Sequence, residues 1–229
     1  MGFSQWLQQL NYDWLLQELF IILAALSAIT VHESAHGLVA CWLGDDTAKS
    51  MGRVSLNPLH HIDLVGLIMM AVVKFGWAKP VPINMRRFKN PKAGMALTAL
   101  AGPVSNVLLA LIATLLCQIF SGTYQLSGSQ WLWYVGLLFY CVAMINAGLA
   151  VFNLIPISPL DGSKVLAVIL PQKSYEWLMR YERYGMIVLV VLLLTGLLDT
   201  PLNFLRTGLL TGLETVTGGL SRMILNLIY

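Results

Sequence analysis

The stretch His32-Glu33-Ser34-Ala35-His36 brings two imidazoles and a carboxylate close together in the sequence. If it is helical, His32 and His36 lie on one face about one turn apart, so both rings can reach a single metal ion. Two neutral imidazoles suit Zn²⁺, and Glu33, which lies beside them without being a ligand, can take a proton from a water bound to that ion. The pattern therefore predicts half of a hydrolytic zinc site.

The residues around this stretch are those of a membrane span. Residues 20–31 before it are almost entirely apolar, and residues 37–43 after it are mostly so. A charged residue at the centre of a bilayer costs roughly 2.5–3.5 kcal/mol on insertion scales, so a glutamate flanked by histidines at this depth indicates a functional site. The alternative is a chance pattern of histidines that only pack between helices.

Asp161 is the best candidate for the third protein ligand that a catalytic zinc needs. It follows a stretch from 93 to 160 that contains no Asp, Glu, Lys or Arg. Pro156 and Pro159 break the helix before it, and Gly162 permits a tight turn. Three protein ligands and one water complete a tetrahedral site, so we expect one zinc per chain. The alternatives are that Asp161 caps the helix that follows and that the prolines are packing kinks.

The composition assigns the chain to the integral membrane proteins. Of its 229 residues, 57% are hydrophobic and only 11% are charged, and the mean hydropathy is +0.72. These values exclude an ordinary soluble domain of this length. The charge-free stretch allows two spans of about 20 residues or more joined by a short turn. The cysteines lie in apolar surroundings without metal-type spacing, so we expect buried free thiols at Cys41, Cys117 and Cys141.

We therefore predict an all-α polytopic membrane protein, a helical bundle that forms a single domain over residues 1–229. It should have about four to six membrane segments around an intramembrane zinc site. The segment that carries the two histidines is expected at about 15–42, and further spans at about 93–120, 131–155 and 184–198. Residues 202–229 form either an interfacial helix or a weak last span. The N-terminus lacks the basic region of a signal peptide, and we expect it to be retained.

The region 43–92 is predicted to be cytoplasmic or re-entrant. Arg53 to Leu56 indicates either a short extended segment or an ordinary loop, with equal weight. Residues 62–73 are apolar but too short to cross a bilayer, which favours a re-entrant or interfacial half-helix. Residues 74–92 hold six basic residues and no acid, so the positive-inside rule makes this loop cytoplasmic. A nucleic-acid role would also explain the basic charge, but membrane topology accounts for it without a nucleic-acid partner.

Two motifs taken together resemble the site-2 protease family of intramembrane zinc metalloproteases, peptidase family M50. His32 to His36 matches HExxH, and Asn153-Leu154-Ile155-Pro156-Ile157-Ser158-Pro159-Leu160-Asp161-Gly162 is similar to the family pattern N-x-x-P-x-P-x-L-D-G. Ser158 replaces the second proline of that pattern, and Pro159 follows it directly. The resemblance covers roughly Thr30 to Lys164 and includes the stretches 52–59, 76–82 and 101–106.

The resemblance implies an enzyme that cleaves transmembrane segments of other proteins within or near the bilayer, as in regulated intramembrane proteolysis. It implies that His32, His36 and Asp161 bind zinc and that Glu33 is the general base. Asn153 matches a family asparagine thought to assist substrate binding, and an interhelical hydrogen bond is its alternative role. No stretch outside the spans is long enough for a PDZ domain, so a compact form without one is expected.

The expected partners are transmembrane substrates and the lipid bilayer. We expect a multi-pass protein of a bacterial-type inner or plasma membrane, with its active site towards the cytoplasm. A substrate helix must be unwound before its scissile carbonyl is accessible, and Arg53 to Leu56 could supply a strand edge to hold the opened backbone.

Other ligands and another class of function stay open. His60 and His61 are rival ligands on chemistry alone, but their loop position favours surface or interfacial residues. A catalytically silent zinc-binding membrane protein, or a metal-handling transporter, could use the same three ligands. A transporter would need further ionisable residues along a path through the spans, and the predicted spans offer none beyond this cluster.

Overall fold

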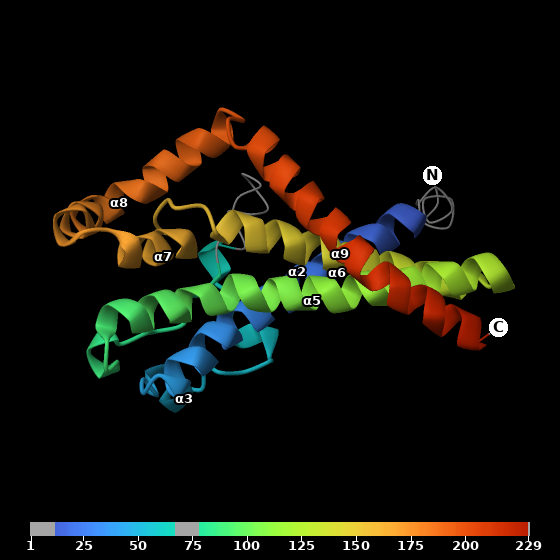
Figure 1. Cartoon of the computed structure of the whole chain (residues 1–229), viewed down its shortest axis with the longest axis horizontal. Helices are drawn as coiled ribbons and strands as arrows, with labels where there is room; N and C mark the ends of the chain where they lie inside the picture. Colours follow the sequence, from blue (N-terminus) through green and yellow to red (C-terminus); the bar gives the residue numbers. More distant parts are fainter. Residues whose placement is uncertain (1–11, 67–77, 229) are drawn as a thin grey trace, which may run out of the picture.

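The computed structural model describes residues 12–66 and 78–228, and it is built almost entirely from helices (Figure 1). The long helices are α2 (Tyr12–Trp42), α5 (Pro91–Ser127), α6 (Gln130–Asn153), α8 (Gln172–Leu194) and α9 (Asp199–Ile228). The short elements are α3 (Thr47–Ser50), η1 (Pro58–His60), η2 (Met85–Arg87) and α7 (Asp161–Ile169). No strand occurs in the described residues, and the predicted all-α class is confirmed.

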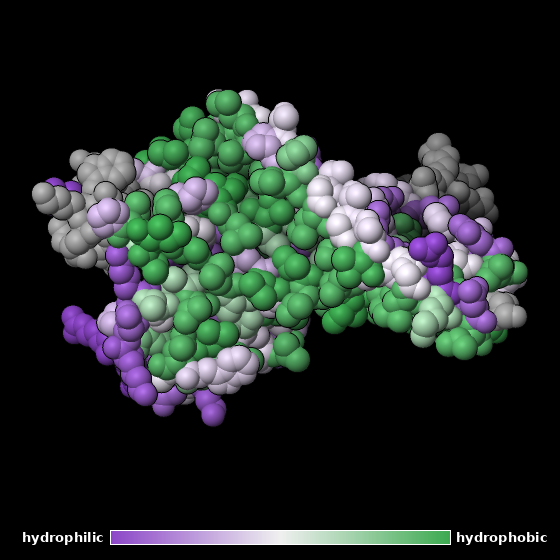
Figure 2. All heavy atoms as spheres, in the orientation of Figure 1, coloured by the Kyte–Doolittle hydropathy of each residue, from purple (hydrophilic) through white to green (hydrophobic). Residues whose placement is uncertain are grey.

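Three helices, α2, α5 and α6, are each long and apolar enough to cross a membrane. The part of α8 from Tyr184 and α9 pass the same test only when they are counted together as a fourth span. The two segments are separated by a short break and meet at an angle of 87°. The described residues thus hold three or four candidate spans, and the prediction of a polytopic membrane protein is confirmed. On the face shown in Figure 2, apolar side chains cover most of the middle of the molecule, while polar ones gather towards the two ends of its long axis.

Small side chains form the contacts between the spans. The buried hydrophobic residues of α2, α5 and α6 are mostly alanines: Ala24, Ala28, Ala40, Ala96, Ala99, Ala110, Ala113, Ala143, Ala147 and Ala150. Large apolar side chains of α5, such as Leu97, Leu108 and Ile112, are exposed instead. Lipid tails are as apolar as leucine, so helices associate in a bilayer through close backbone approach over small residues rather than by burying large ones.

A short turn sets the relative direction of α5 and α6. α5 begins after Asn90, whose Oδ1 accepts a hydrogen bond from the Ala93 N–H, and it ends at Gly128, which has a φ of 67°. α6 then runs back along α5, and the two helices pack extensively on each other and on α2. The end of α6 therefore lies beside the half of α2 that carries the two histidines.

The predicted span at 184–198 is not one continuous helix. α8 ends at Leu194, and Gly196, with a φ of 69°, lies in the turn before α9. α9 packs on α5 and α6, where Leu213 joins a cluster of buried alanines from both helices. Residues 202–228 are thus part of one helix that lies against two candidate spans.

The segment from Arg53 to Leu56 forms a loop against α2, not a strand. The carbonyl of Ser55 accepts hydrogen bonds from the Ser34 hydroxyl and from His61 Nε2, both at 2.7 Å. An edge whose acceptor is already occupied is not available to hold a substrate backbone at that position. The half-helix predicted at 62–73 falls largely outside the described residues.

The three cysteines are free thiols, as predicted. Cys141 is buried, whereas Cys41 and Cys117 are only partly buried. None of them belongs to a group of possible metal ligands in the described part of the chain.

Asp45, just after α2, is hydrogen-bonded to the segment that precedes η2. Its buried carboxylate accepts hydrogen bonds from the N–H and hydroxyl of Thr47 and, at 2.6 Å, from the Asn84 N–H. Burial alone raises the pKa of the Asp45 carboxyl, but these hydrogen bonds outweigh it and hold the pKa below its usual range. Residues 78–83 are thereby held near the end of α2.

Replacing Asp45 by Asn should lower the free energy of unfolding by about 2 kcal/mol at neutral pH, because an amide cannot make the same charge-assisted hydrogen bonds. The folded-state pKa is depressed, so the stabilisation is fully present above the unfolded-state pKa of about 4 and is lost as the pH falls through the folded-state value. Denaturant titrations in detergent at neutral and acidic pH should show parent and variant converging in acid.

Asp46→Asn is the matched control. The Asp46 carboxylate is largely exposed and pairs with Arg87 at the surface, so its loss should change stability by less than about 1 kcal/mol. Equal losses in the two variants would contradict the role assigned to Asp45.

Candidate active site

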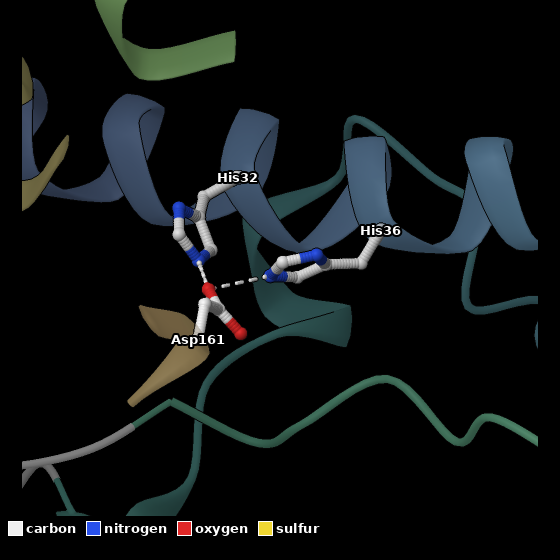
Figure 3. Close-up of side chains that lie close together, drawn as sticks. All are labelled: His32, His36 and Asp161. Carbon is white, nitrogen blue, oxygen red and sulfur yellow. Dashed lines mark hydrogen bonds and ion pairs between the residues drawn. The ribbon is translucent and has the colours of Figure 1, made fainter. Parts of the chain in front are cut away.

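His32 and His36 lie one turn apart on one face of α2, with Asp161 opposite them (Figure 3). The Nε2 atom of each ring is 3.1 Å from Oδ2 of Asp161. The ring centroids are 4.6 Å apart, with an angle of 89° between the ring planes. All three side chains are buried. The structure thus brings together the three residues that the sequence selected, across a separation of 129 positions between His32 and Asp161.

The outer nitrogen of each ring faces a hydrogen-bond acceptor. His36 Nδ1 lies 2.7 Å from the carbonyl oxygen of Thr98, which can only accept, so Nδ1 donates and carries the proton. His32 Nδ1 lies 3.0 Å from Oδ1 of Asn106, and it carries a proton for the same reason. In a neutral imidazole protonated at Nδ1, the lone pair is on Nε2. Both lone pairs are therefore directed at the Asp161 carboxylate.

These three acceptor atoms fit a zinc ion. When the rings are neutral, two lone pairs and a carboxylate oxygen at 3.1 Å repel one another, and a metal cation among them removes that repulsion. With zinc–ligand bonds of about 2.0–2.1 Å, the ligand atoms of a tetrahedral site lie roughly 3.3 Å apart, close to the separation seen here. The second oxygen of Asp161, Oδ1, contacts Lys164 Nζ at 3.3 Å, which leaves Oδ2 facing the histidines.

Helix α5 approaches the histidine pair through Gly102. A Cβ at this position would lie 2.5 Å from His32 Cε1 and 2.6 Å from His36 Cε1, so a larger residue would displace the rings. Asn106, one turn further and fully buried, is the residue that contacts His32. Neither residue has a predicted role, although both lie in the stretch 101–106 that belongs to the family resemblance. The available signal was a glycine and an asparagine one turn apart in an apolar helix.

Asp161 reaches the histidines because the chain folds back sharply after α6. A Cβ on Gly162 would collide with the carbonyl oxygens of Leu154 and Ile155, so this close approach requires glycine. α7 begins at Asp161, but its N-cap residue is Leu160 and makes no side-chain capping hydrogen bond. The Asp161 carboxylate is thus directed at the histidines, and the capping alternative is not observed.

Glu33 lies beside the three possible ligands and not among them. Its Oε2 accepts a hydrogen bond of 3.0 Å from the Val81 N–H. Glu33, His32, His36 and Asp161 line one cavity of about 440 Å³. A carboxylate held at the edge of a metal group and facing such a cavity can exchange a proton with a water there.

Asn153 ends α6 and lines the same cavity. Its Nδ2 donates a hydrogen bond of 3.0 Å to the carbonyl of Leu149 in its own helix. The described residues show no hydrogen bond from Asn153 to another helix, so the interhelical alternative is not observed there.

His60 and His61 lie away from the metal group. His60 is exposed, as its loop position predicts, but His61 is fully buried, and the prediction of a surface or interfacial residue is wrong for it. His61 is buried because its ring bonds the Ser55 carbonyl and its own carbonyl accepts from the Lys79 N–H. The first contact closes the turn around η1 and the second joins it to the segment at Lys79, and no sequence pattern marks either of them.

Comparison with known proteins decides the family. A family model described as peptidase family M50 matches residues 123–196. A protein of Bacillus subtilis (strain 168) named "Putative zinc metalloprotease YwhC" is 38% identical over 182 residues, which cover 78% of this chain and 81% of that protein. The chain belongs to peptidase family M50. The resemblance to site-2 proteases is confirmed, and the chain is a zinc metalloprotease.

More distant relatives of this M50 chain carry similar names. "Putative zinc metalloprotease Rip2" of Mycolicibacterium smegmatis is 26% identical over 185 residues, covering 79% of this chain and 69% of that protein. "Zinc metalloprotease MJ0392" of Methanocaldococcus jannaschii is 27% identical over 184 residues, covering 79% of this chain and 43% of that protein. No solved structure shows a significant match.

Replacing Gly102 by Ala should weaken zinc binding about 10- to 100-fold, the range seen when the support of a metal ligand is lost. The added methyl group would displace both histidine rings from Asp161. Competition with a zinc-binding dye in detergent measures the affinity.

Gly212→Ala in α9 is the control, because a Cβ there meets nothing within 4 Å. A Gly102→Ala variant that binds zinc as tightly as the parent would show that the rings do not need this close approach.

Proposed function

We propose that the chain is an intramembrane protease in which His32, His36 and Asp161 hold one Zn²⁺ per chain and Glu33 is the general base. The observation that carries the proposal is the convergence of two Nε2 atoms and one carboxylate oxygen beside Glu33 in a single cavity of a membrane helix bundle. The reaction is hydrolysis of a peptide bond within or near a transmembrane segment of another membrane protein. Family membership supports the chemistry, and the location of the histidines on a candidate span supports the intramembrane site.

Each side chain then has a defined task. Zinc, when bound, supplies a Lewis acid that lowers the pKa of water to about 7. Glu33 takes a proton from the attacking water and delivers it to the leaving nitrogen, and the Val81 N–H keeps its carboxylate in place. Thr98 and Asn106 hold the histidines with Nε2 directed inwards. Asn153, at the end of α6, is positioned to bind the substrate in the cavity.

We further propose a single domain over residues 1–229 in a bacterial-type inner or plasma membrane, with the active site towards the cytoplasm. His36 lies six residues before the end of α2 at Trp42, a depth of roughly 10 Å at 1.5 Å per residue. Asp46, just beyond that end, pairs with Arg87 of the basic loop. The positive charge therefore lies at the end of α2 nearest to the site, as a cytoplasmic orientation requires. The partners are transmembrane substrates and the bilayer.

Asp161→Asn should lose most of its zinc and its proteolysis, because the amide lacks the anionic ligand oxygen while it keeps the shape of the side chain. Elemental analysis and cleavage of a labelled transmembrane substrate measure the two effects. Asp63→Asn is the control, since in the described part of the chain the Asp63 carboxylate accepts one hydrogen bond, from the Gly66 N–H of the helical residues 64–66, and takes no part in the metal-ligand group. Normal cleavage by the Asp161 variant would mean that the third ligand is another residue.

Glu33→Gln separates a protease from a silent zinc-binding protein or a transporter. The amide cannot accept the proton, so we expect the variant to retain zinc and bind the substrate but to cleave it at least about a hundredfold more slowly. Zinc content and cleavage are measured side by side in detergent or liposomes. Equal cleavage would exclude Glu33 as the base, and no cleavage by the parent across varied substrates would favour the silent or transport function.

A further inference from the structure

A second groove adjoins the catalytic cavity between α2, α6 and α9. It has a volume of about 320 Å³. Three residues line both hollows: Ile29 of α2, and Leu149 and Phe152 of α6. The groove is otherwise apolar except for one residue of α9, Arg206. The two hollows therefore share walls, and the single charged side chain of the groove lies on the wall opposite α2 and α6.

Arg206 is an unusual residue for this position. It lies seven residues into α9, a helix that packs on two spans, and its side chain is partly buried. Its stem lies over Gly148 of α6, with Cδ 3.7 Å from the position of a Cβ there. Ionisable residues at such sites are costly in a bilayer and are retained for a function.

The hydrogen-bonding capacity of Arg206 is only partly used. Its Nη2 donates to Oδ1 of Asn203 at 2.9 Å. No ion pair of Arg206 occurs among the described side chains, although Asp199 lines a neighbouring hollow with it. A guanidinium has five N–H donors and no acceptor, so the group that completes this site must bring hydrogen-bond acceptors.

A substrate in the catalytic cavity would bring such acceptors to the groove. A transmembrane helix that is opened for cleavage leaves carbonyl oxygens without their helical partners, and apolar walls cannot satisfy them. Ile29 lies three residues before His32 on α2, a distance of about 5 Å along the helix axis. An extended chain covers about 3.3 Å per residue, so a few residues reach from the scissile bond into the groove.

We propose that Arg206 is a substrate-binding residue that donates hydrogen bonds to backbone carbonyls of the unwound substrate segment beside the scissile bond. This inference rests on the proposed function, because it assumes that the occupant of the catalytic cavity is a transmembrane segment. The groove recognises the opened backbone and not a particular side chain, so any apolar segment that can unwind at this point satisfies it.

The test compares Arg206→Gln, Arg206→Lys and the parent on a labelled transmembrane substrate that contains no Asp or Glu. For Arg206→Gln we expect KM to rise about tenfold or more, the value of a lost charge-assisted hydrogen bond, with kcat changed less than about threefold and zinc content unchanged. Arg206→Lys should fall between the two, because it keeps the charge but not the planar set of donors. Arg222→Gln is the control on the same helix. Arg222 bonds only its own helix, at the Gly218 carbonyl, in the described structure, and its variant should behave like the parent.

Three results would overturn the inference while leaving the protease intact. The first is a KM for Arg206→Gln within twofold of the parent. The second is a loss that appears only when an acidic residue is placed in the substrate, which would make a carboxylate the ligand of Arg206. The third is a joint fall in kcat and zinc content, which would indicate a structural role. Failure of the parent itself to cleave any transmembrane substrate would instead refute the proposed function, and the inference with it.

Discussion

The mutual repulsion of three acceptor atoms is the constraint on which the rest of this structure depends. His32 Nε2, His36 Nε2 and Asp161 Oδ2 face one another inside a bundle of apolar helices. Thr98 and Asn106 hold the outer ring nitrogens, so the rings cannot turn their protons inward without losing buried hydrogen bonds. Either protonation of the rings at Nε2 or a bound metal cation relieves that repulsion, and the hydrogen bonds to the outer nitrogens keep both Nε2 atoms directed at the place where a cation would bind.

The packing of the bundle serves this arrangement. Burying leucine between helices releases no free energy in lipid, because lipid tails are equally apolar. The spans therefore pack through alanine and glycine, and their backbones come close enough to contact the functional side chains directly. Gly102 brings α5 against the histidine rings, and Gly162 lets the chain turn back from α6 so that Asp161 faces α2. At the end of α2 nearest to the site, Asp45 holds the loop that supplies the Val81 N–H to Glu33. Catalytic geometry and helix association thus rest on the same small residues.

The cavity beside His32, His36 and Asp161 adjoins a groove that is lined in part by α9. This helix contributes no residue to the metal-ligand group. α9 places Arg206 in a groove that shares Ile29, Leu149 and Phe152 with the catalytic cavity. A membrane protease must both open a helix and satisfy the groups that opening exposes. In the function and the inference proposed above, the metal centre carries out the hydrolysis and Arg206 of α9 satisfies the exposed carbonyls, so the hydrolytic site itself needs few residues.

The sequence by itself determined the helix that carries His32 and His36, the two apolar spans that follow it (α5 and α6), and Asp161 as the third residue of the group. These follow from local rules: 3.6-residue periodicity, runs of apolar residues, and a proline-rich break before a single acid. The tertiary structure alone decided that Asn106, Thr98 and Gly102 surround the histidines, that His61 is buried, that residues 53–56 form a loop, and that the chain bends between α8 and α9. These features depend either on contacts between segments that are distant in the chain or on a single turn within an apolar run. Such contacts and turns leave no periodic signal in a single sequence.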